Sequence, residues 1–254
     1  MRTIDDLLPE RAAVANLACF VRQEPLAAYL AEAHYVSASM LRQAMLSGAP
    51  LRAAHIKNDS SQRLAQALHA LVLEPARFAR DYLVLDGDPD VMTTADDPDA
   101  LDRAWLSGGE YAALAAARDA IRAYARASLA QHLEGGLKEL SIYWTDEDGQ
   151  RWKARPDCFT DGVVLELKTT VDVRPHAFAH TRRRFGYDLK AAHYVEAVGR
   201  LTGTAPRFAY LAVELAAPHY VWVHELSATE LARAARELIS AKARFRGAPS
   251  TAAV

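Results

Sequence analysis

The sequence predicts a mixed α/β domain with a helical N-terminal half, because the hydrophobic period changes along the chain. Up to about residue 132, apolar residues recur at helical spacing, and prolines and glycines separate the segments. From Glu139 to Lys168, apolar and polar residues alternate instead, and turn signals divide the runs, which is typical of strands. About half of the 254 residues are apolar, so the chain can bury a substantial core.

The N-terminal half is predicted to form a series of helices, each bounded by a cap or a helix breaker. They are 5–33, interrupted by Pro9 and Pro25; about 39–45, opened by Ser37 and closed by Gly48 and Pro50; 62–73, opened by Ser60 and Ser61 and stopped by Pro75; and about 110–132, preceded by Gly108 and Gly109. The aspartate-rich segment 86–100 is expected to be an exposed acidic loop.

The C-terminal half is predicted to begin with a meander of three strands, 139–145, 151–159 and 163–168. A helix at about 186–202, strands at 207–214 and 219–226, and a closing helix at about 227–245 follow. Ser227 with Glu230 three residues later forms a capping box for that last helix. We expect a single domain over 1–254, with a mainly helical part at 1–136, a core at 137–246 and a tail at 247–254.

Composition excludes several classes of protein. No apolar run approaches the ~20 residues of a membrane span, and the N-terminus lacks the apolar centre of a signal peptide, so a cytoplasmic protein is expected. Cys19 and Cys158 are too few for a disulfide framework or a cysteine-only metal site. The net charge of -2 is no nucleic-acid signature, so any DNA binding must come from local patches.

The register of the meander follows from its pattern. A two-residue Asp161-Gly162 turn pairs Asp157 with Glu166 and Arg155 with Lys168, and it brings the apolar sets of the two strands onto one face. In the first hairpin, a two-residue turn would mismatch the apolar faces, whereas a three-residue loop at 147–149 aligns them and places Glu139 opposite Asp157. One polar face then collects Glu139, Asp157, Glu166, Lys168, Arg155 and Lys153.

This set of residues predicts metal chemistry. Carboxylates on directly opposite strand positions, ~5 Å apart at Cβ, repel one another unless a cation lies between them. Oxygen ligands favour a hard divalent ion such as Mg²⁺. Lys168, two residues from Glu166, can orient a water or stabilise charge on an attacked phosphate, which together indicates phosphodiester hydrolysis. The alternative is a solvated sheet face with ordinary salt bridges.

The same residues resemble a known family. Pro156-Asp157, followed after eight residues by Glu166-Leu167-Lys168, resembles the P-D-(D/E)-x-K motif of restriction-like nucleases. The wider segments resemble RecE-type (exonuclease VIII-like) phage and prophage exonucleases over about 35–225: Ser37–Leu41, Ala67–Phe78, Glu139–Trp144, Lys153–Asp157, Leu165–Thr170 and Tyr187–Tyr194. The resemblance implies a restriction-endonuclease-like core, with a central mixed sheet of the meander and two further strands flanked by helices.

The resemblance also implies roles for single residues. His69 would be a metal ligand brought by the helical half, Asp157 and Glu166 the central ligands, and the Leu167 carbonyl a further one. Lys168 would be the catalytic lysine. By itself, a lone histidine on an apolar helix face is more often a core residue. Glu139 is either an acid supporting the site or an ordinary edge-strand charge.

The helix after the site departs from the family pattern. Tyr194 would be the tyrosine of the family's Gln-x-x-x-Tyr motif and part of the catalytic set, but Lys190 stands at the glutamine position. Lysine offers only donors, and it can still grip a phosphate. The basic run Arg182-Arg183-Arg184 is a further candidate for phosphate contacts. It is expected in a loop before the helix, together with Arg174 and His176, although most such runs are simply solvated. Lys153 and Arg155 either contact DNA or only shield the carboxylates.

Two functions follow as expectations. The first is a Mg²⁺-dependent nuclease, with Mn²⁺ as a substitute, that resects double-stranded DNA in phage-type recombination. The resemblance implies 5′→3′ polarity, a single-strand-annealing partner protein and a ring-shaped homo-oligomer. The second is a non-catalytic DNA-binding or assembly module on a nuclease-like fold, which the lysine at position 190 favours. The intact set of Asp157, Glu166 and Lys168 favours the nuclease.

Overall fold

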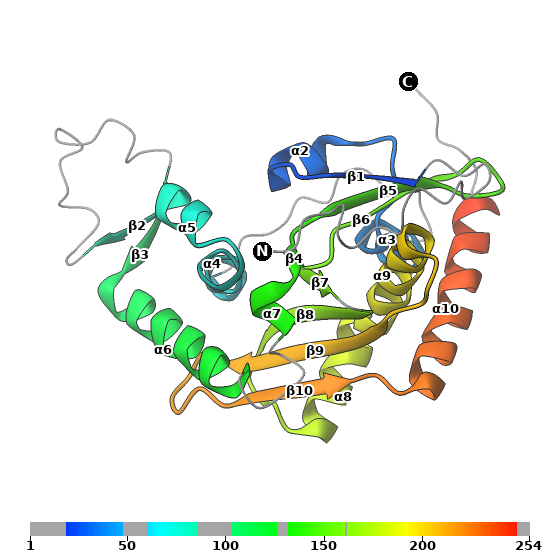
Figure 1. Ribbon diagram of the computed structural model, residues 1–254. Coiled ribbons are helices and arrows are strands. Elements are labelled where there is room, and N and C mark those ends of the chain that lie inside the picture. The colour runs from blue at the N-terminus through cyan, green and yellow to red at the C-terminus, as the bar shows by residue number, and fades with distance from the viewer. Residues whose placement is uncertain (1–18, 48–59, 86–102, 126–131, 161, 248–254) are drawn as a thin grey trace.

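A five-stranded mixed sheet forms the centre of the protein in the computed structural model, which describes residues 19–47, 60–85, 103–125, 132–160 and 162–247. Its strand order is β10-β9-β8-β7-β4 (Figure 1). The strands are β4 (Leu137–Lys138), β7 (Cys158–Thr160), β8 (Val163–Thr170), β9 (Arg207–Glu214) and β10 (Val221–Glu225). Strands β8 and β9 are parallel and the other neighbours are antiparallel, which makes the sheet mixed.

Helices cover both faces of this sheet (Figure 1). Val164, Phe208 and Tyr210 lie in one buried core with residues of α3 (Ala38–Ser47), α8 (Pro175–Phe185), α9 (Tyr187–Thr202) and α10 (Ala228–Gly247). Leu165 and Leu211 lie in a second core with α4 (Ser60–Leu73) and α6 (Gly108–Ala125). The strand alternation was therefore predicted correctly. The face that carries Glu166 is covered by helices, and Glu166 is 0% exposed, which contradicts the alternative of a solvated sheet face.

A smaller sheet of β1 (Cys19–Arg22), β5 (Ser141–Thr145) and β6 (Arg151–Ala154) lies beside the main one, next to α2 (Leu26–Ala31). The predicted helix over 5–33 is therefore wrong at 19–22, while residues 1–18 lie outside the described residues. Phe20 and Val21 are good strand formers, and they pair with Tyr143 and Ile142 of β5. The distant strand decides the conformation of this segment.

Both meander registers were predicted correctly. Cys158 pairs with Leu165 and Thr160 with Val163, the register that places Asp157 opposite Glu166; Asp161 of the turn lies outside the described residues. Trp144 pairs with Trp152 across the first hairpin, and Asp146 N donates to Gln150 O around the three-residue loop.

The continuous strands of the predicted meander, however, are each split between the two sheets. Residue Glu139, with a φ of 52°, separates β4 from β5, and Arg155-Pro156-Asp157 separates β6 from β7. A positive φ is unusual for a residue with a side chain, and proline cannot donate to a strand ladder. The two bends are adjacent, because Glu139 N donates to Asp157 O at 3.1 Å. Arg155 is consequently not paired with Lys168 as predicted.

The remaining elements fall mostly where the sequence predicts them, including α3, α4, α6, α9, β9, β10 and α10. The capping box is formed: Ser227 N donates to Glu230 Oε2 at 2.9 Å and Glu230 N to Ser227 Oγ at 3.3 Å. Sequence periodicity missed five short or polar elements, α5 (Pro75–Asp81), β2 (Tyr82–Leu85), β3 (Ala104–Ser107), α7 (His132–Gly135) and α8. The predicted acidic loop 86–100 and breakers Pro9, Gly48 and Pro50 lie outside the described residues.

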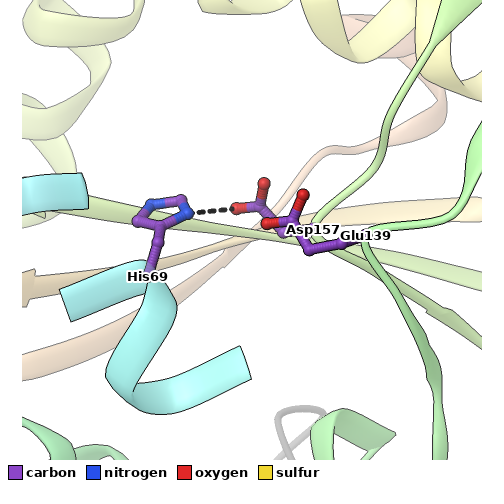
Figure 2. A group of neighbouring side chains, drawn as sticks. All are labelled: His69, Glu139 and Asp157. Carbon is purple, nitrogen blue, oxygen red and sulfur yellow. Dashed lines mark ion pairs between the residues drawn. The ribbon is translucent and has the colours of Figure 1, made fainter. Parts of the chain in front are cut away.

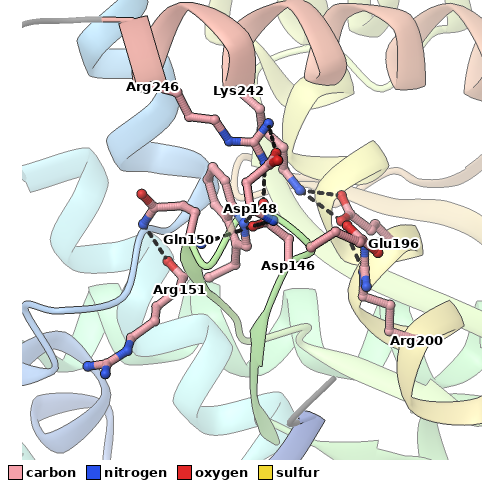
Figure 3. Close-up of polar contacts among 10 residues, drawn as sticks. Asp146, Asp148, Gln150, Arg151, Glu196, Arg200, Lys242 and Arg246 are labelled. Carbon is pink, nitrogen blue, oxygen red and sulfur yellow. Dashed lines mark hydrogen bonds and ion pairs between the residues drawn. The ribbon is translucent and has the colours of Figure 1, made fainter. Parts of the chain in front are cut away.

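Hydrogen bonds and ion pairs join the β5–β6 loop of the small sheet to α10, and α10 to α9 (Figure 3). Buried Asp146 accepts hydrogen bonds at Oδ1 from Gln150 N (2.9 Å) and at Oδ2 from Trp152 Nε1 (2.7 Å) and Arg246. Beside it, Glu196 of α9 accepts from Lys242 of α10 at 2.6 Å. These contacts hold α9 against the hairpin, and α9 is the helix that faces Glu166.

We expect Asp146→Ala to lower the free energy of unfolding by roughly 1–3 kcal/mol, because it leaves the buried Trp152 N–H without an acceptor. Urea denaturation followed by circular dichroism measures this. Asp148→Ala is the matched control, because Asp148 is mostly exposed and its side chain forms only a surface ion pair with Arg246 among the described residues. The loss of stability in this variant should stay below about 1 kcal/mol. Equal effects of the two variants would contradict the role of Asp146.

Candidate active site

Three side chains from distant parts of the sequence converge at the bends between the two sheets. His69 points from α4 toward Asp157 and Glu139 (Figure 2). Its Nδ1 lies 3.5 Å from Asp157 Oδ2, and one ligand atom of each of the three residues lies within 4.8 Å of the others. Burial lowers the pKa of His69 more than the nearby Asp157 raises it, which favours the neutral imidazole that binds metals.

Asp157 is fixed by the strand that carries the other motif residues. Its Oδ2 accepts a hydrogen bond from Leu167 N at 2.7 Å. Burial, together with the charge of Glu166, raises the pKa of Asp157, because His69 and Lys168 offset only part of the penalty. A carboxylate in this position gains stability from a further cation.

Glu139 has its own cationic partner. Arg155 Nε donates to Glu139 Oε2 at 2.8 Å, and Arg155 Nη1 donates to Ser141 Oγ and to Glu24 O, both at 2.9 Å. Burial and the neighbouring Asp157 raise the pKa of Glu139 to about 7. Arg155 is buried and holds Glu139 in place, which agrees with the alternative that it shields the carboxylates and not with a DNA contact. The sequence places Arg155 and Glu139 on one face and leaves the role of Arg155 open, and the structure shows that Glu139 is the carboxylate with which it pairs.

Glu166 lies against two lysines. Its Oε1 accepts from Lys168 Nζ at 2.7 Å and from Lys190 Nζ, while its Oε2 is buried and has no hydrogen-bond partner within the described part of the chain. Burial raises the pKa of Glu166, but the two ammonium groups outweigh it and hold the pKa at about 2. Glu166 is therefore ionised at neutral pH, with one oxygen still available.

Lys168 links Glu166 to the backbone and to an aromatic ring. Its Nζ also donates to Leu167 O at 3.1 Å and lies 5.4 Å from the ring centroid of Tyr187. Lys190 Nζ lies 5.0 Å from the ring centroid of Tyr194, which is buried beneath it. Lys190 was predicted as a DNA contact, but its ammonium is directed at a carboxylate of the site, and Tyr194 supports that lysine.

Two further candidates for DNA contacts are wrong for the same reason, burial in internal contacts. Lys153 Nζ donates to Tyr29 O at 2.6 Å and to Glu32 O at 2.9 Å. Arg182 pairs with Asp188 at 2.8 Å and with Glu230 at 3.0 Å. The basic run lies in helix α8 and not in a loop, so its members point different ways, and Arg183 and Arg184 are exposed.

The donor set fits a hard divalent ion. Ligands of one ion at ~2–2.6 Å from it lie at most about 5 Å apart, and His69, Glu139 and Asp157 meet that limit. The unpartnered Oε2 of Glu166 is a further oxygen that lacks any donor among the described residues. His69, Glu139 and Asp157 are therefore the residues whose ligand atoms converge in this structure. Glu166 and the Leu167 carbonyl stay predictions as further ligands.

Comparison with known proteins agrees with this geometry. The model of the family described as "PDDEXK-like domain of unknown function (DUF3799)" matches residues 40–247. The chain belongs to this family. The mixed sheet flanked by helices confirms the predicted restriction-endonuclease-like fold class. The PDDEXK-like match supports the nuclease superfamily of the predicted motif and does not single out RecE-type exonucleases within it.

Solved structures add a likeness of fold. The crystal structure of a "Putative exonuclease" from Eubacterium rectale is similar to this PDDEXK-like chain with a TM-score of 0.58 and 15% identity, over 89% of this chain and 88% of that one. The structure of the protein SSO0001 overlaps with a TM-score of only 0.29 and 11% identity, over 86% and 88%, and carries no argument. No curated protein matches the chain. Within the described residues, no helix has the length and apolar character needed to cross a membrane.

Proposed function

We propose that the protein is a metal-dependent deoxyribonuclease that hydrolyses phosphodiester bonds. The observation that supports this proposal best is the placement of Lys168 beside buried Glu166, whose second oxygen is free, next to Asp157 and His69. The family match supports a nuclease-like site, and divalent metals suit its oxygen ligands. We propose Mg²⁺ as the ion, with Mn²⁺ as a substitute.

The residues of the site have separate tasks in this proposal. Bound Mg²⁺ would supply Lewis-acid stabilisation of phosphate charge and would make a nearby water more acidic. Asp157, Glu166 and His69 would hold the ion, and Arg155 keeps Glu139 beside them. Lys168 places a positive charge where negative charge develops on the phosphate and orients the attacking water. Burial of the carboxylates strengthens each of these interactions.

We further propose that the enzyme is an exonuclease on double-stranded DNA. The support is the resemblance of its motifs to RecE-type enzymes and its fold likeness to a protein named as an exonuclease. Polarity in the 5′→3′ direction, a role in recombination with a single-strand-annealing partner, and a ring-shaped homo-oligomer belong to the same proposal, as does a cytoplasmic location.

Incubation with linear and covalently closed circular DNA, with and without Mg²⁺, tests the proposal. We expect linear duplex to be degraded from its ends only when metal is present, and closed circles to stay intact. Cutting of closed circles would indicate an endonuclease. Binding of DNA without any cleavage in Mg²⁺ or Mn²⁺ would favour the second candidate, a non-catalytic binding module, for which the Lys190 contact with Glu166 is the supporting observation.

A further inference from the structure

A groove of about 510 Å³ between α3, α8, α9 and α10 is rich in arginine. We call it the arginine groove; it is lined by six arginines, Arg42, Arg183, Arg184, Arg233, Arg236 and Arg244. Glu237 is the one carboxylate among its lining residues. None of these lining residues belongs to the carboxylate site described above.

Most of these arginines are not neutralised by the protein itself. Arg233 pairs with Asp188 at 2.9 Å, but within the described residues Arg183, Arg184, Arg236 and Arg244 form no ion pair. Arg42 donates to the backbone oxygen of Arg184 at 3.0 Å, which ties α3 to α8. Like charges gathered without internal partners repel one another, so the groove has a strong excess of positive charge for an anionic ligand.

The spacing of the arginines on α10 arranges their positive charge along one face of the helix. Arg233, Arg236, Ser240 and Arg244 follow one another at intervals of three or four residues, so they share one helix face. Eleven helical residues span ~16 Å at 1.5 Å each, which corresponds to about five nucleotide steps of a duplex strand. The planar guanidinium group is also the side chain best suited to hold phosphate with two hydrogen bonds.

An aromatic pair connects the groove to the carboxylate site. Gly186 lines the groove, and its neighbour Tyr187 lies against Lys168. Phe185 stacks on Tyr187 with 5.7 Å between ring centroids, and it is 45% exposed. The Arg184 guanidinium lies 5.4 Å from the ring centroid of Phe185. Phe185 and Tyr187 therefore lie between Lys168 and the residues that line the groove.

We propose that the arginine groove binds the sugar–phosphate backbone of the DNA substrate beyond the cleaved bond. The proposal rests on the proposed nuclease function, and it names a substrate-binding surface formed mainly by α8 and α10. The exposed Met45 and Leu46 of α3 give the groove an apolar wall that suits deoxyribose. An acidic peptide with apolar side chains is the competing occupant, but the continuity with Lys168 favours DNA.

The test compares two double variants of equal charge. Arg236→Gln with Arg244→Gln removes two exposed groove arginines. Arg122→Gln with Arg207→Gln is the matched control, because Arg122 is on α6 across the sheet and Arg207 pairs with Val163, the end of β8 away from Lys168. Binding of a labelled linear duplex is measured by fluorescence anisotropy in EDTA over a range of salt concentrations.

We expect the groove variant to bind at least about tenfold more weakly than the parent and to lose about 2 from the slope of log affinity against log salt. The control should keep both values. With Mg²⁺, the groove variant should raise KM for linear DNA and keep kcat, since the reacting groups are untouched.

The proposal would be overturned if the groove variant kept the DNA affinity and the salt slope of the parent. It would also be overturned if the groove variant lost binding of a synthetic Glu- and Leu-rich peptide while its DNA binding did not change. Failure of the nuclease function is separate: the parent would then bind DNA through the groove in EDTA and cleave none in metal.

Discussion

Replacing Asp157 by asparagine is expected to reduce cleavage by about 10³ and to leave DNA binding intact. The substitution keeps an acceptor for Leu167 N, so the tie between the bend and β8 is retained. It removes the charge that faces His69 at 3.5 Å, and a neutral amide is a poor ligand for a hard cation beside two remaining carboxylates. The loss therefore falls on metal affinity and on the chemical step.

Three measurements separate these effects. Calorimetry with Mg²⁺ or Mn²⁺ reports ion binding, single-turnover digestion of linear DNA reports chemistry, and anisotropy in EDTA reports DNA binding. Glu166→Gln should behave in the same way, because it removes the buried charge between Lys168 and Lys190. Asp119→Asn on α6 is the control, an exposed acid remote from the bends. Cleavage within tenfold of the parent in both site variants would place the active site elsewhere.

The relative register of the catalytic strands was predictable from the sequence because it is a local property. Side chains alternate along a strand, so a two-residue turn at 161–162 brings the apolar sets of 151–159 and 163–168 onto one face, and that pairing faces Asp157 with Glu166. The same argument fixed the three-residue loop of the first hairpin. In both cases the turn and the core face constrain residues that are close in the chain.

The environment of the site was not predictable, because it depends on distant partners. Nothing in the alternation of 151–159 shows that Pro156 marks a crossing between two sheets, and Cys19–Arg22 becomes a strand only by pairing with β5. Arg155 and Lys153 were placed on the right strand, but their internal acceptors, Glu24 O, Tyr29 O and Glu32 O, belong to a segment more than a hundred residues away. Lys153 and Arg155 were candidates for DNA contacts, but both side chains are therefore bound inside the protein.

For Lys190, the position on its helix was predictable from the sequence, but its partner was not. The sequence places it one helical turn before Tyr194, so the shared face of the helix was predictable. That this face covers Glu166 is shown only by the structure, in which Lys190 donates to Glu166 and the Lys242–Glu196 pair joins α10 to α9. The family resemblance supplied the position of the residue and the structure supplied its partner.

The two lysines of the site are expected to differ strongly in their contribution. Lys168→Ala should reduce the rate of the chemical step by about 10²–10³, because it removes the charge that stabilises the developing phosphate negative charge. Metal binding should persist, since Asp157, Glu166 and His69 are intact and Lys190 still neutralises Glu166. Single-turnover digestion and Mn²⁺ calorimetry measure the two quantities.

Lys190→Gln should remain active within about tenfold of the parent, because glutamine also donates a hydrogen bond to Glu166 while Lys168 keeps its charge in place. Its salt dependence of DNA binding should not change, since the ammonium of Lys190 is already engaged by a carboxylate and displaces no DNA counterion. Arg122→Ala is the control for the loss of one positive charge. A non-catalytic binding module predicts no cleavage in the parent and hence no effect of Lys168→Ala. Metal-dependent cleavage that disappears in Lys168→Ala and survives in Lys190→Gln would exclude such a module, whereas equal loss in both variants would make the pair of lysines one functional unit and contradict the separate roles assigned here.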